Sequence, residues 1–585
     1  MMKSKFLACT LASVLSACAL TSCDAGVTYV PEEKDDTSYL YIQVYQGGVG
    51  SAYLENVGTA FETAYNGKDG YFAEGKSKVD VVVTSSTSCN GNGLFTNIAN
   101  NNNNLFVAEG MYYLDLAASN LLYDLTDIMD DTLSDGKTIE SKLYEDQQEM
   151  LTVKEDKYFS LPTFAITTGI TIDAEILEAG LYFADEGGND RLQGRVSTYT
   201  GQTYKGRYLI SSKTDKKSPG PDGEYDTYDD GYPSTYEEFF YLLDCMVQSN
   251  IHPMLFTGQS THYTNYIFQS LLSANSTKDE LKANFSFDSK GNKVKVVTGF
   301  EGDQPTISEE VITEANGYLT TQQYNRYLAL KFLSCLFNNK SYYMEALGHN
   351  PATLGNTEAQ KVYEESKFNA ANGHGKRIAM LVEGAYWYNE AKGELVESAG
   401  KFEGADNRNF AYMPLPSKET GTVNEKEGKT VALADALDYY LVANNNIKGN
   451  AEKEKLVREF VKFMYSDAQL QNMTVDTGIP FALKYDLTDA QYEGLDNYKQ
   501  SLWDAYKYSK DNGTYVTPMS DSLIFLNNTD VFSFKTTNRM FHSYVNGVER
   551  NNAYAAFTQY GVSAKDYFKG MWISSSDWSS KYLGA

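Results

Sequence analysis

Five consecutive residues combine the two kinds of side chain that bind a sugar ring. Residues Tyr386-Trp387-Tyr388-Asn389-Glu390 place aromatic rings beside an amide and a carboxylate. A pyranose presents an apolar C–H face and equatorial hydroxyl groups, so its receptor needs aromatic plates and planar hydrogen-bonding partners. Two interpretations of Trp387 remain open here, because a tryptophan at this position can stack on a ligand or anchor the packing of a core.

A second group of candidates follows the first predicted strand. Leu40, Ile42 and Val44 alternate with polar residues, and the glycine-rich run 47–50 ends this strand. The loop supplies Gly48, Val49 and Gly50 as candidate ligand contacts, with Tyr53 after them. A dinucleotide fingerprint is excluded, because the position of its third glycine is occupied by Tyr53.

The elements that position these residues form an α/β pattern. A helix is predicted after residue 50, because Leu54, Val57, Phe61 and Ala64 share one face, and strands are predicted at 79–83 and 105–108. Loops at the carboxyl ends of parallel strands are where ligands of α/β proteins bind, so Glu109 and Tyr112 are candidates as well. A solvated carboxylate is the alternative for Glu109.

Further along the chain the pattern is helical with insertions. Residues 233–250 predict a helix with Ser234 or Thr235 as its N-cap, and Leu456 to Met464 predict a strongly amphipathic one. Residues 285–300 alternate around 289–292 and predict a hairpin that turns there.

An export signal precedes the body of the chain. Lys3 and Lys5 are followed by an apolar run that ends in Leu20-Thr21-Ser22-Cys23. This ending resembles a bacterial lipoprotein signal, in which Cys23 becomes the lipidated first residue; a plain secretory signal with an incidental cysteine is the alternative. We therefore expect a signal peptide at 1–22, a polar tether at 23–38, and a body at the extracellular face of the cell membrane.

The amino-acid composition limits the classes of ligand that the protein is expected to bind. The chain has 585 residues, with 77 acidic and 50 basic side chains and a net charge of -27, which argues against nucleic-acid binding and favours a neutral ligand over an anionic one. Tyrosine is abundant, with 46 residues, which suits sites that meet polar partners bearing an apolar face. The five histidines and the scattered cysteines form no zinc pattern, so no cofactor is required.

Several ordered motifs resemble one family. They are the glycine-rich loop, Lys157 to Pro162, Ala379 to Trp387, Tyr412 to Pro416, and Glu459 to Met464 through Gly478-Ile479-Pro480. Their order resembles the extracellular solute-binding proteins of sugar ABC transporters, of the maltose-binding type. The resemblance implies a type II periplasmic-binding-protein-like fold: two α/β lobes joined by three crossings, with a sugar cleft between them. It also implies delivery of the sugar to permease subunits by a monomeric receptor that is not an enzyme.

The resemblance also implies boundaries and site residues. Lobe one would comprise 39–165 and 440–482, and lobe two 166–439 and 483–585, with insertions near 184–231 and 275–310. The crossings would lie at 163–169, which includes Phe164 as a candidate contact, near 435–440, which includes Asp438, and near 481–485. Tyr386 aligns with the usual stacking residue, a tryptophan in many members, so which of Tyr386 and Trp387 stacks stays open. His262 and Tyr263 are weaker candidates from lobe two.

An acidic loop lies at residues 220–230. Its acidic residues are interrupted by glycine, and their carboxylates could bind a structural calcium ion as a clip. The spacing does not fit an EF-hand, and a solvated acidic loop without calcium is the alternative. The residues concerned are Asp222, Glu224, Asp226, Asp229 and Asp230.

The rival function is a cell-surface glycoside hydrolase or lyase, which needs a placed pair of carboxylates that no motif isolates. A surface adhesin is disfavoured by the absence of sequence repeats.

Overall fold

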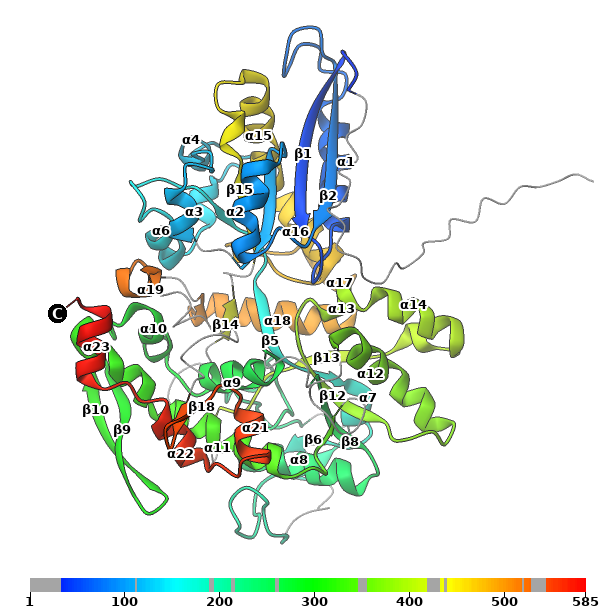
Figure 1. Cartoon of the computed structure of the whole chain (residues 1–585). Coiled ribbons are helices and arrows are strands. Elements are labelled where there is room, and N and C mark those ends of the chain that lie inside the picture. Colours follow the sequence, from blue (N-terminus) through cyan, green and yellow to red (C-terminus); the bar gives the residue numbers. More distant parts are fainter. Residues whose placement is uncertain are drawn as a thin grey trace, which may run out of the picture.

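The protein has two lobes, one above the other in Figure 1. The structure, a computed structural model, describes residues 33–110, 113–188, 194–211, 216–257, 262–345, 355–417, 432–435, 439–517, 520–527 and 543–584. Three predicted functional residues, Cys23, Tyr112 and Asp438, lie outside these ranges. Within them, no helix combines the length and the apolar character needed to cross a membrane.

Lobe one is built on a five-stranded sheet. Its strand order is β2 (Lys78–Ser86), β1 (Thr37–Tyr45), β3 (Leu105–Glu109), β15 (Tyr439–Ala443) and β4 (Leu161–Pro162). Strand β1 is parallel to β2 and β3, whereas β15 is antiparallel to β3 and β4. Most side chains of β1 are buried, as expected for a parallel strand covered on both faces. The helices of this lobe are α1 (Ala52–Tyr65), α2 (Gly91–Asn100), α3 (Tyr113–Ala118), α4 (Thr126–Met129), α5 (Ile139–Lys142), α6 (Glu145–Leu151), α15 (Ala451–Met464) and α16 (Asp467–Thr477).

Lobe two is built on a seven-stranded sheet. Its order is β11 (Tyr343–Glu345), β8 (His252–Phe256), β12 (Ile378–Gly384), β5 (Ile166–Asp173), β14 (Ala432–Asp435) and β16 (Tyr515–Val516), and β13 (Phe410–Met413) also pairs with β5. Strand β8 is parallel to β11 and β12, whereas β5 is antiparallel to β12 and β13. Its helices include α7 (Ala174–Glu178), α8 (Tyr236–Gln248), α9 (His262–Ala274), α11 (Tyr324–Asn338), α12 (Asn356–Ala371), α13 (Trp387–Glu390), α14 (Lys392–Lys401) and α18 (Asn497–Asp511).

The two sheets share one plan, which explains how the lobes are joined. Each has three parallel strands followed by an antiparallel strand that arrives from the other lobe: β15 completes lobe one, and β5 completes lobe two. The chain therefore crosses between β4 and β5, between β14 and β15, and between α16 and α18. The first and third crossings lie against each other, because Phe164 pairs with Phe481 and their ring centroids are 4.5 Å apart. The predicted two-lobed α/β fold is confirmed.

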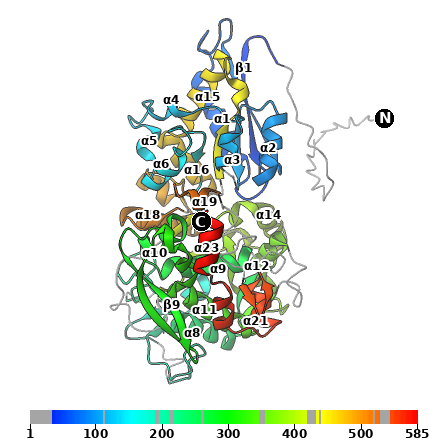
Figure 2. The same ribbon diagram turned by 60° about the vertical axis from the view of Figure 1, so that its left-hand side comes forward.

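Additional elements extend lobe two and the junction between the lobes. They are the hairpin of β6 (Tyr182–Ala184) and β7 (Tyr208–Ile210), helix α10 (Lys278–Ser286), the hairpin of β9 (Lys293–Glu301) and β10 (Gln304–Val311), α17 (Asp489–Glu493), α19 (Leu523–Asn527), β17 (Ser543–Val545), β18 (Val548–Arg550), α21 (Ala553–Thr558), α22 (Ala564–Gly570) and α23 (Ser575–Tyr582). In Figure 2, α18 and α19 lie at the level where the two lobes meet.

The hairpin predicted at 285–300 is wrong in its position. A capping box formed by Thr277 and Glu280 starts helix α10, and this helix extends through Phe285. Phe287 takes a left-handed conformation that ends the helix, and the observed hairpin turns later, between β9 and β10. The apolar residues that alternate in this segment therefore belong partly to the end of α10 and partly to strand β9.

Candidate functional site

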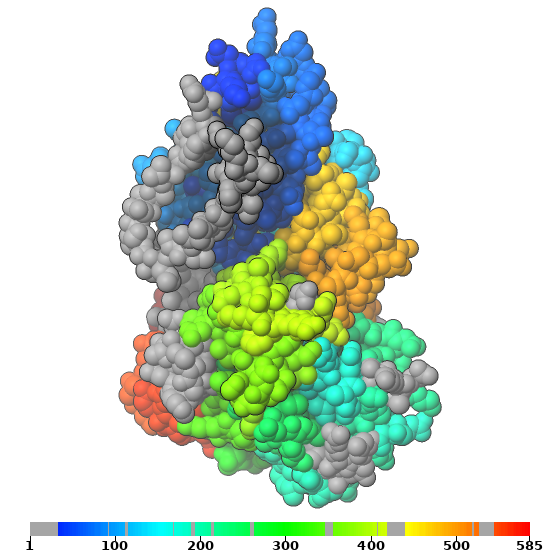
Figure 3. Space-filling view, turned by 90° about the vertical axis from the view of Figure 1, so that its right-hand side faces the viewer, coloured from blue at the N-terminus to red at the C-terminus, as the bar shows by residue number. Residues whose placement is uncertain are grey.

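Loops from both sheets meet between the lobes. From lobe one come the loop between β1 and α1, which contains Gly48, and Glu109 at the end of β3. From lobe two comes the turn from β12 into α13, which contains Tyr386 and Glu390. All of these positions follow the carboxyl ends of parallel strands, where α/β proteins place their ligands. Figure 3 shows α12–α14 directly beneath lobe one and beside the surface of residues 450–510.

Glu390 joins the two lobes. Its Oε1 accepts a hydrogen bond of 3.3 Å from the backbone N–H of Gly48 in lobe one. Its Oε2 accepts from Asn356 Nδ2 at 2.9 Å and from Gln360 Nε2 at 3.0 Å, both on α12. A carboxylate held by three donors has a fixed orientation, so Glu390 presents its charge to the glycine-rich loop.

Glu383 lies behind Glu390 and is only 3% exposed. The same Gln360 Nε2 lies 3.2 Å from its Oε1, and the backbone N–H of Gly384 donates to its Oε2 at 3.3 Å. Burial, together with the nearby charge of Glu390, raises the pKa of Glu383 well above its usual range. Two carboxyl groups in one polar cluster therefore have different environments, and Glu383 retains its proton to higher pH.

Tyrosines form the ring component of the site. Tyr386 is half-buried, and its hydroxyl lies 2.7 Å from the hydroxyl of Tyr266 on α9. The Tyr266 ring makes an edge contact with Tyr263, with centroids 5.5 Å apart. Burial raises the pKa of Tyr386 and of Tyr263 well above the usual value, so both remain neutral phenols. The Tyr386 ring also approaches the backbone of Gly48 in lobe one.

Trp387 faces the opposite way and is fully buried. Its ring centroid lies 5.4 Å from that of Phe410, 5.6 Å from that of Tyr498 and 6.1 Å from that of Tyr363. These neighbours belong to lobe two, and they leave Trp387 no open face for a ligand. Trp387 is therefore placed as the packing interpretation expects, and Tyr386 is the ring that faces lobe one.

Lobe one contributes a smaller polar group. Glu109 Oε2 accepts a hydrogen bond of 2.9 Å from Asn90 Nδ2 at the start of α2. Burial raises the pKa of Tyr45, and the charges of Glu109 and Glu390 act in the same direction. Tyr45 therefore lies in the field of carboxylates from both lobes, which places these three side chains in one region between the lobes.

Three other predicted contacts belong to the supporting core. Val49 is buried, and Tyr53 is 2% exposed on the inner face of α1. Phe164 is fully buried, with its ring centroid 4.9 Å from that of Tyr53 in an edge contact. These residues hold the glycine-rich loop against the first crossing rather than lining an open surface. The side chain of His262 lies outside the described residues.

The sequence analysis missed several members of the cluster. They are Tyr45, Asn90, Tyr266, Asn356, Gln360 and Glu383. Two of them carried a usable signal, because Tyr45 ends the strand two residues before the glycine-rich run and Glu383 interrupts an apolar strand. A buried carboxyl group in a strand costs free energy unless it has hydrogen-bond partners, so its presence indicates a polar cluster nearby.

The acidic loop binds its own backbone. Asp229 is fully buried, and its Oδ2 accepts from the N–H of Asp222 at 2.9 Å. Asp222 Oδ1 accepts from the N–H of Glu224 at 2.7 Å, and Asp230 Oδ2 from the N–H of Asp226 at 2.9 Å. Among the described residues, no group of three or more His, Cys, Asp or Glu side chains is placed to hold a metal ion.

Comparison with known proteins gives structural likenesses at low identity. The GacH receptor of Streptomyces glaucescens is similar over 93% of this chain and 99% of its own, with 12% identity and a TM-score of 0.48. RafE from Streptococcus pneumoniae matches over 92% and 99%, with 12% identity and a TM-score of 0.46. The maltotriose-binding protein of Thermus thermophilus matches over 92% and 99%, with 12% identity and a TM-score of 0.45. No family model and no curated protein sequence matches the chain.

Proposed function

We propose that the protein is an extracellular receptor that captures a sugar between its two lobes. The observation that carries this proposal is the contact between Glu390 and the Gly48 N–H, with the Tyr386 ring beside it. It places a carboxylate, amides, tyrosine rings and a glycine-rich backbone loop where the two lobes meet. Closure of lobes around a ligand is a recurrent hinge motion, and here it would join these groups.

The chemistry of the cluster suits a neutral oligosaccharide. Hydroxyl groups can donate to the carboxylates of Glu109 and Glu390 and exchange hydrogen bonds with the amides of Asn90 and Gln360. The Tyr386 ring supplies an apolar surface for the C–H face of a pyranose. Uronates are disfavoured, because carboxyl groups already gather here and the chain carries a net charge of -27.

The proposal extends to transport. A lipid on Cys23 would hold the receptor at the extracellular face of the cell membrane, with residues 23–38 as a tether. The receptor would act as a monomer, deliver its sugar to the permease subunits of an ABC transporter, and need no cofactor. Support comes from the export signal, the order of the sequence motifs and the two-lobed fold.

Calorimetry tests the proposal. The purified chain is titrated with a panel of neutral oligosaccharides, and we expect one class to bind. The Tyr386→Ala variant should bind that class at least ~fivefold more weakly, because a stacked ring contributes about 1 kcal/mol or more. The matched control is Tyr560→Ala, which removes a tyrosine ring that is 55% exposed in the C-terminal region.

Three outcomes would contradict parts of the proposal. Equal binding by wild type and Tyr386→Ala would remove the site assignment. Failure of every sugar in the panel to bind would remove the receptor function. Release of reducing ends from a glycan would favour the hydrolase or lyase instead.

A further inference from the structure

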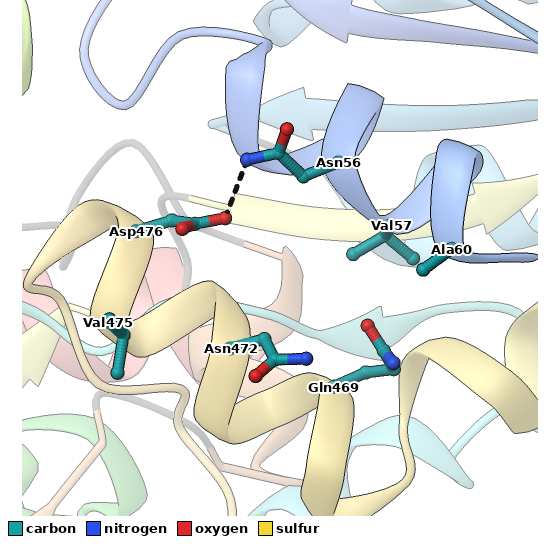
Figure 4. Close-up of a pocket in the computed structure, with 7 residues that line it drawn as sticks. All are labelled: Asn56, Val57, Ala60, Gln469, Asn472, Val475 and Asp476. Atoms are coloured by element: carbon teal, nitrogen blue, oxygen red, sulfur yellow. Dashed lines mark hydrogen bonds between the residues drawn. The ribbon is translucent and has the colours of Figure 1, made fainter. Parts of the chain in front are cut away.

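A hollow lies in lobe one, between helices α1 and α16. It has a volume of about 260 Å³ and is shown in Figure 4. The residues that line it are Asn56, Val57, Ala60, Gln469, Asn472, Val475 and Asp476. None of them belongs to the cluster around Glu390, so this groove is separate from the proposed sugar cleft.

Gln469 gives the groove an unmatched polar group. The residue is only 9% exposed, and no hydrogen bond joins its side-chain amide to a residue that the structure describes. Figure 4 shows this amide directed into the space between the two helices, with the amide of Asn472 beside it. Because this amide borders the open space of the groove, water or a ligand there can supply its hydrogen bonds.

The opposite end of the groove carries one charged group. Asp476 Oδ2 accepts a hydrogen bond of 2.8 Å from Asn56 Nδ2, which fixes the carboxylate at the mouth. Asp476 interacts electrostatically with Lys392. Burial and the charge of Lys499 lower the pKa of Lys392, and the charge of Asp476 opposes this effect. Because its charge is offset by a neighbouring cation, the groove is not strongly attractive to cationic ligands.

We propose that this groove binds a small, neutral, polyhydroxylated molecule of about the size of one sugar ring. A hydroxyl group both donates and accepts, which matches the amides of Gln469, Asn472 and Asn56, and it can also donate to Asp476. Val57, Ala60 and Val475 supply an apolar surface for C–H groups. The lining contains no aromatic plate, so it differs in kind from the cleft beside Tyr386.

The groove is adjacent to a contact between the lobes. The last turn of α16 offers two carbonyl groups to lobe two: Val475 O accepts from Lys499 Nζ at 2.9 Å, and Thr477 O from Asn389 Nδ2 at 2.7 Å. An occupant would touch Val475 and Asp476 in that same turn. It would therefore stabilise the segment of lobe one on which the α13 turn rests.

The experiment titrates the full mature chain with D-glucose and with myo-inositol, and follows the side-chain amide signals of Gln469 and Asn472 by nuclear magnetic resonance. Signals are assigned with Gln469→Leu and Asn472→Ala. We expect saturable shifts of both amides, and at least ~tenfold weaker binding in Gln469→Leu, which keeps the side-chain volume but removes the hydrogen bonds. Spermidine serves as the cationic comparison and should leave both signals unmoved.

The Tyr386→Ala variant separates this site from the proposed sugar cleft. Groove binding should persist in it, so a failed cleft proposal leaves the groove result intact. Asn472 is exposed on the surface of α16, so Asn472→Ala tests the groove even if Gln469→Leu does not fold. The proposal is wrong if neither polyol shifts the two amides, if spermidine alone does so, or if the folded groove variants bind as wild type does.

Discussion

Replacing Gly48 by alanine should damage the protein in a way that separates two physical effects. Gly48 has a φ of +54°, a left-handed conformation that residues with a side chain rarely adopt. A Cβ at this position would also lie closer than 3.0 Å to the hydroxyl of Tyr439, which is 2% exposed at the start of β15. The substitution therefore adds backbone strain and a steric clash at the centre of the site.

The magnitude follows from these two contributions. A left-handed conformation costs a residue with a Cβ about 1 to 2 kcal/mol. Forcing a methyl group into a packed region costs a further ~1 to 3 kcal/mol. We therefore expect Gly48→Ala to lower the free energy of unfolding by about 2 to 5 kcal/mol, measured by urea denaturation.

Gly50→Ala is the matched control. Gly50 has a φ of +76°, but no atom lies within 4 Å of the Cβ that alanine would add. This variant should carry the strain alone, at about 1 to 2 kcal/mol. Comparing the two variants removes the shared cost of a left-handed alanine in the same loop.

Tyr439→Phe tests the clash directly. It deletes the hydroxyl, after which the nearest ring atom would lie 3.4 Å from the alanine Cβ, an ordinary contact. The double variant Gly48→Ala, Tyr439→Phe should recover about 1 to 3 kcal/mol relative to the sum of the single variants. The reasoning is refuted if Gly48→Ala costs no more than Gly50→Ala, or if the double variant shows no recovery.

Three further predictions concern packing, pH and metal. Trp387→Ala should lower the free energy of unfolding by about 3 to 5 kcal/mol, whereas Tyr386→Phe, which loses only a hydroxyl contact, should cost about 1 kcal/mol; equal losses would contradict their placement. Burial raises the pKa of Glu364 to about 8. Between pH ~4.5 and ~8 the folded state therefore holds a proton that the unfolded state has released, and the free energy of unfolding should fall by up to about 1.4 kcal/mol per pH unit as the pH rises. Melting curves of Glu364→Gln should show a smaller decline over this pH range. Chelation and return of calcium should leave the melting temperature unchanged, because backbone N–H groups already donate to the carboxylates of Asp222, Asp229 and Asp230. A rise in melting temperature on return of calcium would favour the calcium clip instead.

Elements with strong local patterns could be predicted from the sequence. The amphipathic face from Leu456 to Met464 forms α15, and its apolar residues are buried as the spacing indicates. Thr235 caps α8 and accepts from the Glu238 N–H, as one of the two proposed N-caps. Such features depend on residues within a few positions of one another, so periodicity and capping chemistry suffice to identify them.

The orientation of neighbouring side chains could not be predicted in the same way. Tyr386 and Trp387 are adjacent and chemically similar, yet one faces the other lobe and the other enters the core with Phe410 and Tyr498. The choice depends on how the turn after β12 sits on the sheet, which is a tertiary property. The partners of Glu390 were missed for a related reason, because Gln360 lies on a different helix and no local pattern links the two.

The exchange of strands between the lobes connects the hinge to the site. Strand β15 enters lobe one at the second crossing, and its first residue, Tyr439, places its hydroxyl beside Gly48. Phe164, in the first crossing, packs against Tyr439 with ring centroids 6.2 Å apart and also contacts Phe481 of the third. Residues of all three crossings thus meet at one core, directly beneath the loop that receives Glu390. Because Glu390 belongs to lobe two and Gly48 to lobe one, a change in the angle between the lobes alters their contact, even though no crossing residue takes part in it.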